Sequence, residues 1–173
     1  TKEEKVLHPL MRSVSLSLQA GSTIGFTDYK HSKLDFIWRT TAEYFFNTFT
    51  NHLVGLMGSA GIGGIGGNDI SKEPQDFKSD IKFFGAGITY GYVVSNEFSP
   101  TISAVFSYLT FDPKDRNGSK LQNNIDNKYN KNVINLNFEA GLRYFVTNDF
   151  SVKFNFGFAF NFHDWLDDIE NGS

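Results

Sequence analysis

Six charged residues at odd-numbered positions of strand-like segments are the side chains best placed to do chemistry: Asp35, Arg39, Glu43, Glu139, Arg143 and Lys153. Successive side chains of a β-strand point to opposite faces, so within each segment these residues share one face. Three are acids and three are bases, so they can neutralise one another if they are buried together. Such a cluster could line a pore or plug a narrow barrel, and we predict the structural plug.

The four histidines do not form a recognisable site. His8, His31, His52 and His163 are scattered along the chain, without the spacing of metal ligands or of a catalytic triad. His163 is followed by Asp164 and could serve a lipid-acting site at the rim of a barrel. We expect it to be an ordinary polar residue of an interior or a rim.

Two further motifs lack what a ligand site needs. The glycine-rich run at 60–67 has no Lys-Ser/Thr pair and precedes no helix, so strand packing explains it better than phosphate binding. The segment 112–118 has scattered oxygen ligands, but Lys114 and Arg116 interrupt the alternation of a calcium loop. No catalytic residue, cofactor site or metal site is predicted.

Apolar residues alternate with polar or small residues along most of the chain. Near the end, even positions from Val152 to Phe162 are apolar, while Lys153 and Asn155 lie between them. Seven such segments are predicted as strands, with tight turns and longer connections between them in alternation. Their ranges are 13–27, 34–48, 52–66, 81–95, 99–111, 133–147 and 150–163.

The composition is compatible with a membrane β-barrel and argues against membrane-spanning helices, nucleic-acid binding and disulfide bonds. The 173 residues include 19 Phe and 7 Tyr, yet the mean hydropathy is only -0.30, as expected when each apolar residue has a polar neighbour. No apolar run is long enough for a membrane-spanning helix. The net charge of -3 argues against nucleic-acid binding, and the absence of cysteine excludes disulfides.

The chemistry of the two faces indicates which one meets lipid. Even positions carry large apolar residues, with Tyr and Trp mostly near strand ends, where an interface favours them. Odd positions carry Gly, Ser and charged residues, which suit a narrow interior better than an exposed sheet surface. The fold class is therefore an all-β, up-and-down antiparallel transmembrane β-barrel. The alternative is a soluble, lipocalin-like lipid carrier with the even face as its core.

With these features the chain resembles the small bacterial outer-membrane β-barrels of the eight-stranded outer membrane protein A/X type. The resemblance rests on the alternation, the aromatic strand ends, the short turns opposite long loops, and the interior charges. It implies a location in the bacterial outer membrane, with outer-membrane lipid and lipopolysaccharide as partners and an attached periplasmic or surface domain as a further candidate partner. We expect a lead segment or linker at 1–12 and the barrel domain at 13–173. The expected function is a membrane anchor or surface-presentation domain without catalysis; the alternative within the family is a lipid-modifying enzyme.

One departure from the family concerns the number of strands. Seven strands are predicted where the family has eight, so we expect a further strand after Ser173, with a partner chain as the second candidate donor. The alternative is an odd-numbered barrel that is closed by one parallel pair of strands. Assuming tight turns near Asn148 and Thr50, Glu139 should lie opposite Gly157 and Arg39 opposite Gly61.

Overall fold

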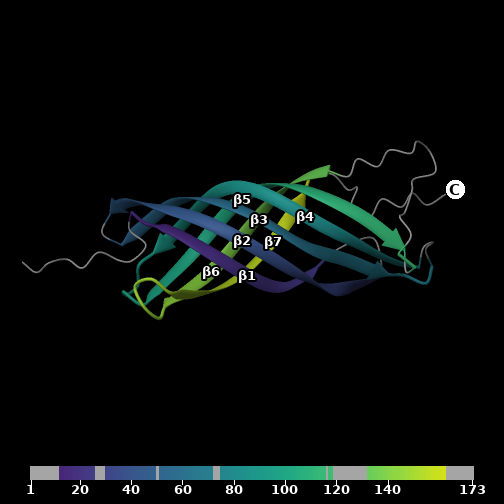
Figure 1. Cartoon of the computed structure of the whole chain (residues 1–173), viewed down its shortest axis with the longest axis horizontal. Coiled ribbons are helices and arrows are strands. Elements are labelled where there is room, and N and C mark those ends of the chain that lie inside the picture. The colour runs from purple at the N-terminus through teal and green to yellow at the C-terminus, as the bar shows by residue number, and fades with distance from the viewer. Residues whose placement is uncertain are drawn as a thin grey trace, which may run out of the picture.

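The computed structural model describes residues 12–25, 30–49, 51–71, 75–115, 117–118 and 132–162. Over these residues the chain forms one antiparallel sheet of seven strands, each paired with the next in sequence. Figure 1 shows the strands running obliquely along the long axis of the molecule, with the tight turns at the left. The predicted up-and-down architecture is confirmed. The strands are β1 (Val14–Ile24), β2 (His31–Phe49), β3 (His52–Asn68), β4 (Asp76–Tyr92), β5 (Phe98–Asp115), β6 (Asn132–Phe145) and β7 (Ser151–Asn161).

Two predicted features lie largely outside the described residues. Of the lead segment 1–12, only Arg12 is described, so the boundary between it and the barrel domain stays a prediction. His8 and His163 are also outside the described part. Within that part, no helix is long and apolar enough to cross a membrane.

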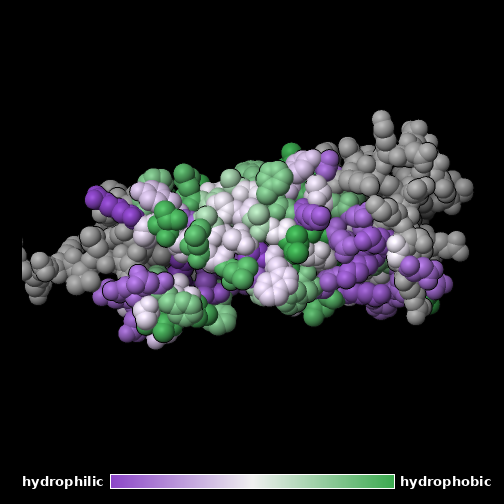
Figure 2. Space-filling model, viewed as in Figure 1, coloured by the Kyte–Doolittle hydropathy of each residue, from purple (hydrophilic) through white to green (hydrophobic). Residues whose placement is uncertain are grey.

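The outer face of the curled sheet is apolar, and its inner face is polar over most of its length. Phe156 is 81% exposed and Leu16 is 76% exposed, whereas Glu43 and Arg143 are 1% exposed. Figure 2 shows apolar residues gathered over the middle of the visible face, with hydrophilic residues toward both ends. This inside-out arrangement suits a molecule whose outer surface is solvated by hydrocarbon.

Strands β4 and β5 are longer at one end than their alternation predicts. β4 begins at Asp76 instead of residue 81, and β5 ends at Asp115 instead of residue 111. The two strands stay paired there, and Lys114 Nζ donates to Asp80 Oδ2 at 2.5 Å. The alternation stops at the edge of the band of apolar side chains on the outer face, but the backbone hydrogen bonds between the two strands continue beyond it. We call this end the loop end and the opposite one, which carries the tight turns, the turn end.

The predicted pairings of large with small interior residues are confirmed. Arg39 of β2 lies opposite Gly61 of β3, and Glu139 of β6 lies opposite Gly157 of β7. A Cβ atom added at Gly157 would lie 2.8 Å from Glu139 Cγ, and one at Gly61 would lie 2.5 Å from the Phe83 ring. These glycines therefore leave the space that their neighbours occupy.

The outward position of Phe156 predicts a large cost for a charge at that position. Phe156→Arg should destabilise the protein in lipid bilayers by about 2–4 kcal/mol, because the guanidinium would lie in hydrocarbon. Urea unfolding in vesicles measures this cost. The control Phe156→Leu keeps an apolar side chain and should cost far less; equal stability of the two variants would contradict the inside-out arrangement.

The glycines of β3 predict opposite outcomes for one added methyl group. Gly61→Ala should cost about 1–3 kcal/mol, because the methyl group would overlap the Phe83 ring and the Trp38 carbonyl. Gly58 has nothing within 4 Å of an added Cβ, so Gly58→Ala should be neutral or slightly stabilising. Thermal unfolding of the two variants tests the difference, and a Gly61→Ala variant as stable as Gly58→Ala would contradict the tight packing.

Candidate functional site

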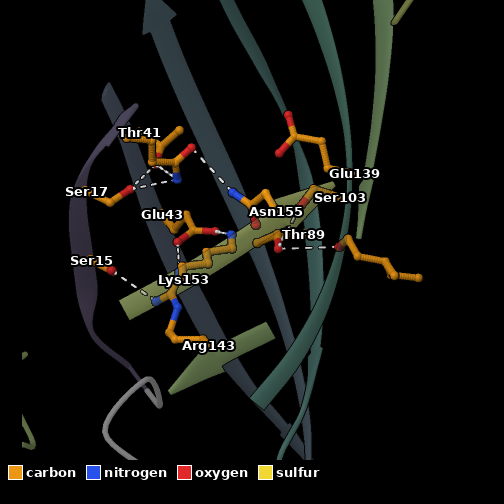
Figure 3. Close-up of polar contacts among 12 residues, drawn as sticks. Ser15, Ser17, Thr41, Glu43, Thr89, Ser103, Glu139, Arg143, Lys153 and Asn155 are labelled. Atoms are coloured by element: carbon orange, nitrogen blue, oxygen red, sulfur yellow. Dashed lines mark hydrogen bonds and ion pairs between the residues drawn. The ribbon is translucent and has the colours of Figure 1, made fainter. Parts of the chain in front are cut away.

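The centre of the site is a carboxylate that contacts two cations inside the curled sheet. Glu43 Oε1 of β2 accepts a hydrogen bond from Lys153 Nζ of β7 at 2.8 Å, and Glu43 Oε2 accepts one from Arg143 Nη2 of β6. All three side chains are at most 6% exposed. We call Glu43, Arg143 and Lys153 the ionic triad. In Figure 3, Lys153 and Arg143 converge on Glu43, and Ser15 of β1 lies beside the Arg143 guanidinium.

A second ion pair lies nearer the loop end. Arg39 of β2 forms a two-pronged contact with Glu139 of β6, in which Nη2 donates to Oε2 at 2.8 Å. Gln19 of β1 accepts from Arg39 Nε at 2.8 Å, so the guanidinium is held from two sides. Such paired, planar contacts are among the strongest hydrogen-bonded ion pairs. Together with the ionic triad, this contact brings five of the six charged residues of the predicted network into the interior.

Asp35 lies apart from the other five residues of the predicted network. The pairing of β2 with β3 shifts by one residue between Lys33 and Ile37, and Asp35 lies within this irregularity. Its carboxylate packs on Gly64 and pairs with Lys78 Nζ of β4 at 3.4 Å. Strict alternation would carry Asp35 into the interior, but the shift places it in a group of ion pairs at the loop end.

Two apolar clusters lie on either side of the interior charges. The turn-end cluster consists of Phe45, Leu53 and Phe145, with Val93 packed against them. The loop-end cluster consists of Ile81, Leu109, Phe111 and Val133, with Ile65 and Phe83 packed against them. The alternation did not predict these clusters, because it treated odd positions as uniformly polar. Large apolar residues at odd positions near strand ends were the signal that could have revealed them.

The ion pairs at the loop end form a surface group outside the lumen. Lys33 Nζ contacts Asp76 Oδ1 at 2.7 Å, and Lys114 Nζ contacts Asp80 Oδ2 at 2.5 Å. Their side chains are partly exposed, and they line a shallow depression together with Asn68 and Lys78. Exposed pairs of this kind contribute little to stability.

The other motifs lie apart from the interior charges. His52 Nδ1 lies 2.6 Å from the Tyr90 hydroxyl at the turn end, and His31 begins β2 at the loop end. The glycine-rich run lies inside β3, where it packs against neighbouring strands as predicted. Among the described residues, no group of three or more His, Cys, Asp and Glu could hold a metal ion.

Comparison with known families gives one match. The family model described as outer membrane protein beta-barrel domain matches residues 12–172. No curated protein and no solved structure matches the chain significantly.

Removing the central carboxylate should destabilise the fold strongly. Glu43→Gln would leave Arg143 and Lys153 as neighbouring buried cations, at a cost of about 3–5 kcal/mol. Equilibrium unfolding in detergent or bilayers measures it. The control Asp80→Asn removes a partly exposed partner of Lys114 and should cost less than about 1 kcal/mol. A Glu43→Gln variant no less stable than Asp80→Asn would contradict the role of the ionic triad.

Proposed function

Because this chain belongs to the outer membrane protein β-barrel domain family and so resides in the bacterial outer membrane, we propose that it serves as a membrane anchor or surface-presentation domain. In this proposal its lumen is filled by side chains and it has no catalytic activity. The observation that carries the proposal is the set of paired charges and apolar clusters inside the curled sheet. An anchor needs a stable apolar exterior and no passage through its centre.

Successive layers of side chains support a closed lumen. From the turn end, the turn-end cluster is followed by the ionic triad, then by Arg39 and Glu139, and then by the loop-end cluster. A conducting lumen needs a continuous polar path, and the apolar clusters interrupt such a path at both ends. A barrel of this size has an interior just wide enough for side chains.

The use of the interior charges also favours an anchor over an enzyme. Arg39 donates to Glu139, and Glu43 accepts hydrogen bonds from both Lys153 and Arg143. A general acid or base needs access to a substrate. These carboxylates instead serve buried ion pairs, so we assign them a structural role.

Lipid is the partner that the exterior suits best. Phe84 and Tyr108 end the apolar part of β4 and β5, and Lys82, Lys78 and Lys114 follow toward the loop end. We propose that these lysines lie at the level of lipid headgroups, where phosphate groups of outer-membrane lipid and lipopolysaccharide can contact them. A periplasmic or surface domain attached to the barrel would complete its role as an anchor.

Epitope insertion tests the proposed presentation at the cell surface. A short epitope placed after Gly118, at the loop end, should be labelled by antibody on intact cells. The matched epitope after Glu97, at the turn end, should be labelled only after the outer membrane is permeabilised. The proposal places the loop end outside the cell and the turn end in the periplasm, and labelling with the opposite pattern would contradict it.

Planar-bilayer recording tests the filled lumen with the same preparation. The full-length protein should insert without steps of current, because the apolar clusters interrupt the polar path. Regular steps of current that persist after further purification would show a pore and would contradict the proposal of a closed anchor.

A further inference from the structure

The two edge strands of the sheet face each other across a seam. β1 and β7 are its first and last strands, and no backbone ladder joins them in the described part of the chain. Side chains nevertheless bridge the seam on its inner side. Asn155 Nδ2 of β7 lies 3.4 Å from Gln19 Oε1 of β1, and Arg143 Nη1 donates to Ser15 Oγ of β1 at 3.1 Å.

The side-chain contact across the seam agrees with the width of one strand. Paired strands lie about 4.8 Å apart, so an empty strand position separates its neighbours by about 10 Å. Two extended amide side chains, such as those of Asn155 and Gln19, can just meet across such a distance. On β7, Asn155 and Gly157 are also exposed although they face the interior, so nothing described covers that side of the strand. In hydrocarbon, each unpaired backbone group costs several kcal/mol.

The direction of the edges restricts what can fill the seam. β1 and β7 both run from the turn end to the loop end, so one strand of opposite direction can pair antiparallel with both. A second copy of the sheet cannot supply it edge to edge, because copies inserted in the same orientation would offer only parallel edges. β7 ends at the loop end, and a hairpin from there would return in the required direction.

The charges next to the seam are unbalanced. Among the described interior residues, Arg39 and Glu139 neutralise each other, but Glu43 alone faces both Arg143 and Lys153. The sixth member of the predicted network, Asp35, lies at the loop end with Lys78. Arg143 Nε, on a side chain that is 1% exposed, has no hydrogen-bond partner in the described part of the chain. An excess buried cation and an unsatisfied donor are both costly, and both lie beside the empty position.

We infer that the seam is filled by one further strand of the same polypeptide, antiparallel to β1 and β7, which carries a carboxylate on its lumen face beside Arg143 and Lys153. The backbone of this strand satisfies the two open edges. Its carboxylate balances the second cation of the ionic triad. This inference adds a specific side-chain requirement to barrel closure and does not depend on the proposed anchor function.

Cysteine pairs test the geometry of the seam, since the chain has no native cysteine. Phe156 pairs directly with Ala140 of β6, and the contact of Asn155 with Gln19 places Phe156 level with Ala20 of β1. In the full-length protein in native membranes, Ala140→Cys with Phe156→Cys should form a disulfide on oxidation. Ala20→Cys with Phe156→Cys should not, because disulfides need Cα atoms within about 7 Å. Equal bridging of the two pairs would overturn the inference.

A photo-crosslinker identifies the strand that occupies the seam. Benzoylphenylalanine in place of Phe156 should capture β6 and, in addition, a segment of the same polypeptide outside β1–β7. Mass spectrometry of the captured peptide should reveal an acidic residue with the parity of the lumen face. Capture of a different protein, or of β1 itself, would overturn the inference.

Whether Lys153→Met lowers or raises the stability of the protein tests for the inferred carboxylate on the further strand. If the strand supplies it, Lys153→Met in the full-length protein leaves one buried carboxylate unpaired and raises the unfolding constant on the order of a hundredfold. If it does not, the same change leaves Glu43 and Arg143 as a neutral pair, and stability stays equal or increases. Lys153→Arg is the matched control and should remain close to the parent protein.

A second substitution keeps the test decisive if Lys153→Met fails to fold. Neutralising the acidic residue found in the captured strand should restore folding in the Lys153→Met background, read as the shift in SDS electrophoretic mobility on heating. No restoration, or a stable Lys153→Met variant by itself, would overturn the carboxylate assignment.

Discussion

The small volume inside the curled sheet is the constraint on which the rest of this structure depends. A small barrel has room only for interdigitated side chains, so every large interior residue needs a small neighbour. Arg39 lies opposite Gly61, and Glu139 lies opposite Gly157. The glycines that look costly in a strand therefore leave space for large neighbours, the Phe83 ring at Gly61 and the Glu139 side chain at Gly157. Within the described interior, ion pairs and hydroxyl groups lie in contact with one another.

Charged residues in the lumen also fix which strands oppose one another. Glu43 reaches Lys153 across 110 residues of sequence, and Arg39 reaches Glu139 across 100. A slip of one residue in β2 would turn its interior side chains toward lipid. Because a charge in the middle of a bilayer costs several kcal/mol, such a slip is heavily disfavoured. The buried charges thus contribute more to the uniqueness of the register than to net stability, which buried ion pairs often leave unchanged.

Alternation in the sequence was sufficient to predict the seven strands, the face that meets lipid and the pairing across two tight turns. It could not locate the loop-end limits of β4 and β5, because backbone pairing continues where apolar alternation stops. It also gave no sign of the register shift in β2 between Lys33 and Ile37, beside which Asp35 pairs with Lys78 at the loop end. The apolar clusters were missed for a different reason: residues such as Phe45 and Val133 face the interior near its ends, where the lumen need not be polar. The parity of a residue predicts which face of the sheet its side chain lies on. Only the packing of the side chains determines what surrounds it at each level along the barrel axis.

The interior is asymmetric around its axis, and this asymmetry explains how the sheet can stay curled. Its long charged side chains come from β2, β6 and β7, whereas the facing walls of β3, β4 and β5 carry mainly small residues in the middle of the lumen. Hairpin pairing alone joins only sequence neighbours and does not bring β2 to β6. The ion pairs supply that long-range contact, and they supply it on the side where the sheet is open. In the inferred closed barrel, they hold the edges β1 and β7 where both can pair with the same strand. Closure of the barrel is then a local step that completes a curvature already set by the charges inside.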